Sequence, residues 1–177
     1  MSGASIVVSG GLLGPGGVET HLALLLPWLA ERGHRVTLAA REVNWRAFPI
    51  AEMRDRGVDV ALPPDWLRVP SRMEVARVGV GWLPLLGRRA TSVYWPGAGL
   101  GHAKLSRLFS GNPVTIYHEI VGIREAGPVA RRTLGAAQAA VGNSDLISAD
   151  IREMAPGVPV RTIPFVTSAA AIPRATP

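Results

Sequence analysis

Residues 5–41, SIVVSGGLLGPGGVETHLALLLPWLAERGHRVTLAAR, decide the fold. The β-branched run at residues 6–8 predicts a buried strand, and a glycine-rich loop follows it. Apolar residues between positions 18 and 29 recur at helical spacing, and Gly33 predicts a left-handed cap that ends this helix. Residues 36–40 then predict a second strand. Strand, loop, helix and strand in this order form one βαβ unit of a parallel sheet.

The rest of the chain continues this alternation. Further strands are predicted at residues 58–62, 91–95, 114–118, 139–142 and 160–163. Helices are predicted for a short segment that ends at residue 56 and at residues 71–89, 103–109, 128–138 and, capped by Ser144 or Asp145, up to residue 154. Alternating strands and helices favour the α/β class, as one Rossmann-like domain with a doubly wound parallel sheet over residues 1–166. Residues 167–177 are rich in Ala, Pro and Thr and predict a linker or disordered tail.

The glycine loop has two interpretations. Its main-chain N–H groups and the helix behind it could hold a phosphate or diphosphate, or the loop could be a tight turn that binds nothing. A Walker loop is excluded because Val18 and Glu19 follow Gly17 where Lys and Ser or Thr are required. The dinucleotide fingerprint is not met either, because the third glycine comes too early, at Gly17. Arg41 stands where a dinucleotide-binding strand usually ends in an acidic residue, and it would suit a 2′-phosphate.

Composition and charge limit the class of protein. The chain has 177 residues, 47% of them hydrophobic and 18% charged, enough for one full core. We expect a cytoplasmic protein, because the sequence contains no cysteine, no apolar stretch of membrane-spanning length and no signal-like N-terminus. The net charge of +6 is spread over scattered arginines, which does not favour nucleic-acid binding.

A basic surface could still attach the chain peripherally to the inner face of an anionic membrane, although solvated, scattered arginines are the simpler interpretation. The basic residues that could share such a surface are Arg72, Arg77, Arg88, Arg89, Lys104 and Arg107.

Candidate binding residues lie at the carboxyl ends of the predicted strands, where open α/β sheets bind ligands. His118 and Glu119 end the strand at residues 114–118, and Arg41 follows the second strand. His118 could donate a hydrogen bond to a sugar hydroxyl or a phosphate, or it could be a loop histidine held by backbone groups. If protonated, it could also stabilise charge on a departing phosphate, and Glu119 beside it could favour that form. The four histidines show no metal-ligand spacing, so no metal site is expected.

Two segments carry a resemblance to a known family. Residues 16–19, Gly-Gly-Val-Glu, and residues 31–37, Glu-Arg-Gly-His-Arg-Val-Thr, resemble the opening of family 4-like glycosyltransferases of the two-domain GT-B type. The resemblance is specific over residues 5–41 and looser elsewhere. It implies the N-terminal, acceptor-side domain of a hexosyltransferase-type enzyme that moves a sugar from a nucleotide-sugar donor to a glycan or lipid acceptor, with retention of configuration and no cofactor. It also implies that Gly16 and Gly17 contact the donor diphosphate and that His118 faces the donor sugar.

The sequence departs from this family near its C-terminal end. Residues 163–166, Ile-Pro-Phe-Val, keep only the first half of the family's Ile-Pro-Asn-Gly-like turn, and no two glutamates have the family's spacing of eight. The resemblance places those glutamates in a C-terminal domain, so we expect this chain alone to be inactive without that domain. Two other classes stay open, namely an NADP-type oxidoreductase and a non-catalytic domain that binds a glycan, a lipid or a partner protein.

Overall fold

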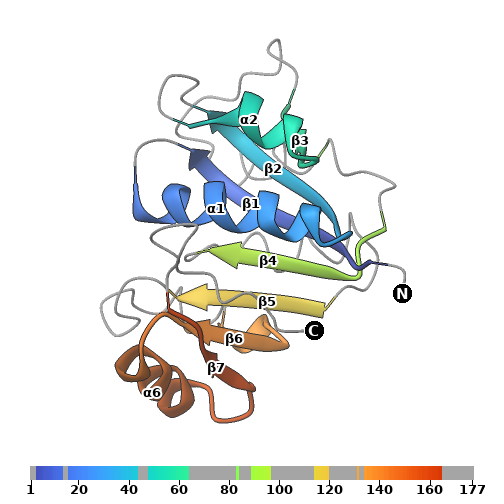
Figure 1. Ribbon diagram of the computed structural model, residues 1–177. Helices are drawn as coiled ribbons and strands as arrows, with labels where there is room; N and C mark the ends of the chain where they lie inside the picture. Colours follow the sequence, from blue (N-terminus) through green and yellow to red (C-terminus); the bar gives the residue numbers. More distant parts are fainter. Residues whose placement is uncertain are drawn as a thin grey trace.

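The protein is a parallel α/β sheet flanked by helices, as the sequence predicts. The computed structural model describes residues 3–13, 16–43, 48–63, 83, 89–96, 114–119, 131 and 134–164. In this part of the chain seven strands form one sheet of order β3-β2-β1-β4-β5-β6-β7, with every neighbouring pair parallel (Figure 1). The doubly wound Rossmann-like class is therefore confirmed.

The elements follow one another along the chain in this order. The first half holds β1 (Ser5–Leu13), α1 (Gly17–Glu31), β2 (Arg35–Val43), α2 (Ile50–Asp55) and β3 (Asp59–Ala61). The second half holds β4 (Ser92–Pro96), β5 (Val114–Glu119), β6 (Ala139–Gly142), α6 (Asp145–Met154) and β7 (Val160–Thr162). The strand order reverses between β1 and β4, and such a switch point is where open α/β sheets bind their ligands.

Helix ends follow the predicted chemistry. Gly33 after α1 and Gly57 after α2 have φ of 82° and 86°, in the left-handed region that favours glycine. At the start of α6 the Ile147 N–H donates to Ser144 Oγ at 3.3 Å, which makes Ser144 the N-cap.

The first two strands are longer than predicted. β1 runs to Leu13, and its last residues pair with β2, for example Gly10 with Ala40 and Leu12 with Glu42. Gly10 therefore lies inside the strand instead of the loop, because the backbone ladder with β2 does not need a side chain. Since β2 also continues to Val43, Arg41 lies within the strand and not after its end.

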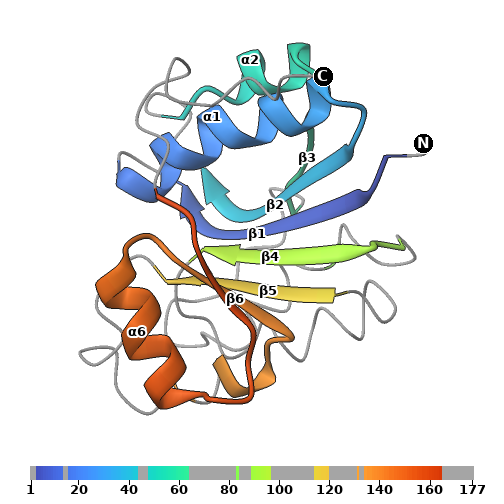
Figure 2. The ribbon, with the colours of Figure 1, turned by 60° about the horizontal axis from the view of Figure 1, so that its bottom comes forward.

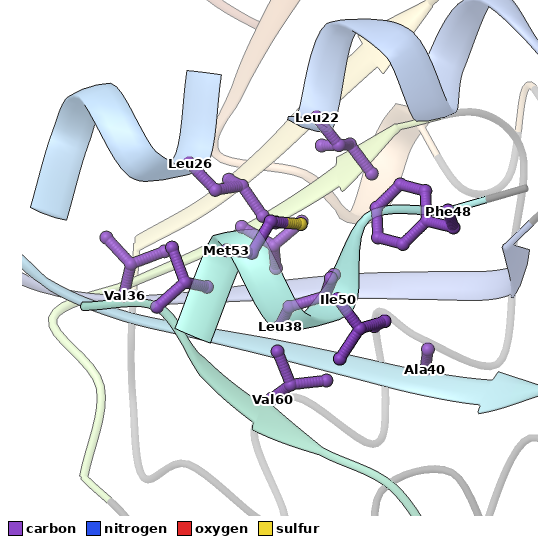
Figure 3. Close-up of a cluster of buried hydrophobic side chains, with 11 residues drawn as sticks. Leu22, Leu26, Val36, Leu38, Ala40, Phe48, Ile50, Met53 and Val60 are labelled. Carbon is purple, nitrogen blue, oxygen red and sulfur yellow. The ribbon is translucent and has the colours of Figure 1, made fainter. Parts of the chain in front are cut away.

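Two apolar clusters cover opposite faces of the sheet, since neighbouring residues of a strand point to opposite sides. On one face α1 and α2 pack over β2, with Leu22, Leu26 and Met53 buried against Leu38 (Figure 3). The other face carries Val7, Val93 and Tyr117, which pack with Ile151 of α6 and with Leu134. Figure 2 shows α1 and α2 together, apart from α6.

In the part of the chain that the structure describes, the sheet has a short strand at each edge. β3 and β7 have three residues each, and each carries an exposed charged residue, Asp59 in β3 and Arg161 in β7.

Some predictions lie outside the described residues. These are the helix at 71–89 apart from residues 83 and 89, the helix at 103–109, residues 128–130 and 132–133 of the helix at 128–138, the tail at 167–177 and every residue of the basic surface except Arg89. None of the helices in the described ranges has the length and apolar character needed to cross a membrane.

Candidate functional site

The candidate site lies at the carboxyl ends of β1, β4 and β5, where α1 begins. In Figure 1 the first turn of α1 lies on the side to which the arrowheads of these strands point. The βαβ connection requires this arrangement, because the chain leaves β1 at its carboxyl end and enters α1 there. The switch point and the N-terminus of α1 therefore coincide.

Gly16 and Gly17 form the start of α1. Gly16 is the N-cap, with extended backbone at φ −175° and ψ 169°, and Gly17 is the first helical residue. The Gly16 carbonyl accepts hydrogen bonds from the Thr20 N–H at 3.0 Å and from Thr20 Oγ1 at 2.9 Å. A Cβ added at Gly17 would meet no atom within 4 Å, so the space beside this residue is open.

Glu19 lies over the same helix start. A Cβ added at Gly16 would overlap the Glu19 carboxylate, so this side chain reaches back to the N-cap from the third helical position. That is the placement of the acidic residue in a capping box, and it puts a negative charge at the positive end of the helix dipole. The protein's own carboxylate thus occupies the region in which an anionic ligand would bind.

Three polar side chains from three elements meet beneath this helix start. The Tyr94 hydroxyl of β4 is hydrogen-bonded to His118 Nδ1 of β5 and lies 3.4 Å from His21 Nε2 of α1. The two imidazole rings are in edge-to-face contact, with centroids 5.5 Å apart and planes at 78°. His21 is 2% exposed and His118 is 1% exposed, so both are buried. We call these three residues the His–Tyr–His cluster.

Burial sets the charge of the cluster. Burial lowers the pKa of His21 to about 4, and burial together with the nearby His21 lowers the pKa of His118 to about 4. Burial also raises the pKa of Tyr94 above its ordinary value. At neutral pH the cluster is uncharged. A protonated His118, which the sequence suggested with Glu119 beside it, is therefore not the form present at neutral pH.

The residues predicted from the sequence fall into two groups. Gly16, Gly17 and His118 lie at one end of the sheet, because His21, on the second turn of α1, contacts His118. His118 is one residue from the end of β5, but it is buried on the α1 face and not directed into open solvent as its strand-end position suggested. Glu119 ends β5 and Arg41 lies within β2, and the side chains of both are outside the described part.

Sequence reasoning missed His21 and Tyr94. His21 lies three residues after Val18 and four before Leu25, on the same apolar stripe of α1, so helical spacing could have identified it as a buried histidine. Tyr94 follows the buried Val93 in β4 and points to the other face. Among the described residues, no three His, Asp or Glu side chains are grouped to hold a metal ion.

Comparison with known proteins supports the fold. No protein-family model and no curated protein sequence matches the chain. A crystal structure described as that of a UDP-N-acetylglucosamine 2-epimerase from Listeria monocytogenes matches it with a TM-score of 0.56 and 10% sequence identity. The match covers 86% of this chain but only 42% of that one. The chain thus has a GT-B-like, Rossmann-type fold and spans less than half the length of this structural neighbour.

Proposed function

We propose that the chain is the acceptor-side half of an enzyme that transfers a sugar from a nucleotide-sugar donor to a glycan or lipid acceptor, with retention of configuration. One observation carries the proposal. The glycine turn that opens α1 lies at the switch point of a GT-B-like sheet, and His21 and Tyr94 connect this helix to His118. The structural neighbour, described as an epimerase of a UDP-sugar, supports a substrate of the same class.

In this proposal the donor diphosphate binds at Gly16 and Gly17. The first turn of a helix presents N–H groups that have no acceptor within the helix, together with the positive end of the dipole. The open space beside Gly17 admits a ligand close to the backbone. Glu19 then has to move from the N-cap, because two anions cannot share that position.

His118 acts in this proposal as a neutral donor to the sugar. Its lowered pKa leaves an uncharged imidazole, which can donate one hydrogen bond. Because the side chain is 1% exposed, it contacts a sugar only at the floor of the site, after the site has opened to admit the ligand. Arg41 and Glu119 are weaker candidates for contacts in the cleft.

A second domain supplies the remaining contacts to the nucleotide. The proposed domain boundary is at residue 166, with residues 167–177 linking the two halves. Transfer between two domains needs their closure to orient donor and acceptor. We therefore assign donor binding to both halves and expect only weak binding by residues 1–177.

Amide NMR spectra of the ¹⁵N-labelled chain test the assignment at residue level. UDP-glucose, UDP-N-acetylglucosamine, GDP-mannose and pyrophosphate are titrated separately, with NADP⁺ as the competing ligand. We expect nucleotide sugars and pyrophosphate to shift the amide signals of residues 16–20. The matched control is Gly157→Val, at another glycine with open space beside it and far from α1 in sequence, which should leave these shifts unchanged.

The alternatives give different spectra. Shifts produced by NADP⁺ alone would support the oxidoreductase interpretation. No shift with any of these ligands would contradict the proposal and favour a non-catalytic binding domain.

A further inference from the structure

The Tyr94 hydroxyl can donate a hydrogen bond to only one of the two histidines. It lies between His118 Nδ1 and His21 Nε2, and a phenol has a single hydrogen to donate. Tyr94 can therefore donate to at most one of the two imidazole nitrogens, and a hydrogen bond with the other nitrogen is one that the phenol oxygen accepts. The cluster therefore has a direction, and that direction fixes which nitrogen of each ring carries a hydrogen.

The length of the contact with His21 indicates the direction. Tyr94 Oη lies 3.4 Å from His21 Nε2, which is longer than a hydrogen bond donated by O–H. Hydrogen bonds donated by O–H are shorter than those donated by N–H. The phenol hydrogen therefore belongs in the bond to His118 Nδ1, and the 3.4 Å contact is that of an N–H donated by His21 Nε2.

We propose that His21 and Tyr94 are positioning residues that hold His118 in the neutral tautomer protonated on Nε2. The chain of hydrogen bonds runs from His21 Nε2–H to the Tyr94 oxygen, and from the Tyr94 hydroxyl to His118 Nδ1. His118 then presents a donor at Nε2, where the other tautomer would present an acceptor. The low pKa of both histidines means that each ring is neutral and carries a single ring hydrogen.

The consequence for binding rests on the proposed function. A sugar hydroxyl or a diphosphate oxygen can accept from an Nε2–H, and a diphosphate oxygen cannot donate to a bare nitrogen. His21 lies five residues after Gly16 on α1, so the same helix that begins at the diphosphate turn also orients the histidine assigned to the sugar. His21 and Tyr94 thus act on the ligand through His118.

Long-range ¹H–¹⁵N spectra of the imidazole rings test the tautomer directly, in residues 1–177 without any ligand. We expect His118 to show a protonated Nε2 and an Nδ1 that accepts a hydrogen bond. His34 is an internal reference, because its Nδ1 accepts the Ala4 N–H at 3.1 Å and its hydrogen is therefore on Nε2. An Nδ1-protonated His118 in the wild-type chain would overturn the proposal.

Three variants separate positioning from packing. Tyr94→Phe keeps the ring and removes the hydroxyl, so the two His118 nitrogen signals should move toward each other as the tautomers mix, while the His34 signals stay in place. His21→Leu should weaken the preference in the same direction, and His21→Gln should restore it because the glutamine amide is also an N–H donor. Unchanged His118 signals in a folded Tyr94→Phe chain would show that the cluster contributes packing and does not set the tautomer. Equal spectra for His21→Leu and His21→Gln would show that His21 does not act as a hydrogen-bond donor to Tyr94.

These outcomes are independent of the proposed function. If the tautomer behaves as expected but no nucleotide sugar shifts residues 16–20, the role in sugar transfer fails and the control of the His118 tautomer stands. If nucleotide sugars bind but Tyr94→Phe leaves the His118 signals unchanged, the positioning role fails and the proposed function stands.

Discussion

At the scale of single residues, the burial of His21 and His118 decides their charge and ties it to folding. Both are neutral in the folded chain, with pKa values lowered to about 4, whereas an unfolded histidine has its ordinary value of 6.5. Below pH 6.5 the unfolded chain therefore binds protons that the folded chain does not bind. Lowering the pH therefore shifts the folding equilibrium toward the unfolded state.

The first prediction is a loss of stability on mild acidification. The free energy of unfolding should fall as the pH drops from about 7 to about 5, by up to about 1.4 kcal/mol per pH unit for each histidine, and these groups should contribute no slope above pH 7. Urea midpoints at pH 7, 6 and 5 measure it. The double variant His21→Gln/His118→Gln should show a smaller slope than the wild type, and equal slopes would mean that the two histidines titrate normally.

The second prediction concerns His118→Ala. In an assembled two-domain enzyme, turnover should fall on the order of 10²-fold, as it does when one preorganised donor is removed. A histidine facing open solvent would leave stability nearly unchanged, but the burial of His118 against Tyr94 predicts a loss of about 1–3 kcal/mol. Turnover and melting temperature are measured in the same variant. A melting loss with normal turnover per folded molecule would mark His118 as structural.

At the scale of secondary-structure elements, the two ends of α1 use glycine for different reasons. Gly33 after the helix has a φ of 82°, while Gly16 before it is extended at −175°. Of the glycines in the described ranges, only Gly33 and Gly57 have positive φ, so substitutions at Gly16 and Gly17 do not strain the backbone in this way. At Gly16 and Gly17 the effect of a substitution therefore depends on the space around the new side chain and not on backbone strain.

The third prediction uses this space. Gly17→Val places its side chain where the structure has no neighbouring atom, so the free energy of unfolding should change by no more than about 0.5 kcal/mol. The same side chain stands in the proposed path of the diphosphate, so the ligand-induced shifts of residues 16–20 should disappear. Donor affinity equal to that of the wild type would refute the assignment of Gly16 and Gly17.

The fourth prediction tests the helix cap. Gly33→Ala should cost about 1–2 kcal/mol, because a Cβ is strained in the left-handed region. Gly157→Ala is the matched control, with open space and no positive φ, and should be close to neutral. Urea unfolding of both variants gives the comparison, and similar losses in the two would argue against a left-handed Gly33.

The sequence predicts most of the elements because apolar periodicity and cap residues are local signals. Gly33, Gly57 and Ser144 end or begin helices where their chemistry requires it. Apolar periodicity does not predict the length of β1, because Gly10 pairs with β2 through backbone atoms alone.

The cluster has no local signal either, since Tyr94 meets a histidine 73 residues earlier in the chain. The burial of His118 depends in the same way on His21 of α1 and Tyr94 of β4, and not on the residues beside it in sequence.

At the scale of the whole molecule, the fifth prediction is that residues 1–177 alone turn over no nucleotide sugar. The chain spans 42% of the structural neighbour. In the proposed function the transfer takes place between two domains and therefore needs both. Release of nucleoside diphosphate is measured with the isolated chain and with the same chain joined to a C-terminal nucleotide-binding domain. Robust transfer by the isolated chain would contradict this interpretation of the site.

The short outer strands have a consequence for behaviour at high concentration. A long, flat sheet edge invites pairing with another molecule and leads to fibrils. Among the described residues the sheet ends in β3 and β7, which offer three residues each, and the charges of Asp59 and Arg161 lie on those strands. A second copy gains few backbone hydrogen bonds by docking there and has to desolvate a charge to do so. In the described part of the chain, the two outer strands therefore offer little for edge-to-edge pairing with another molecule.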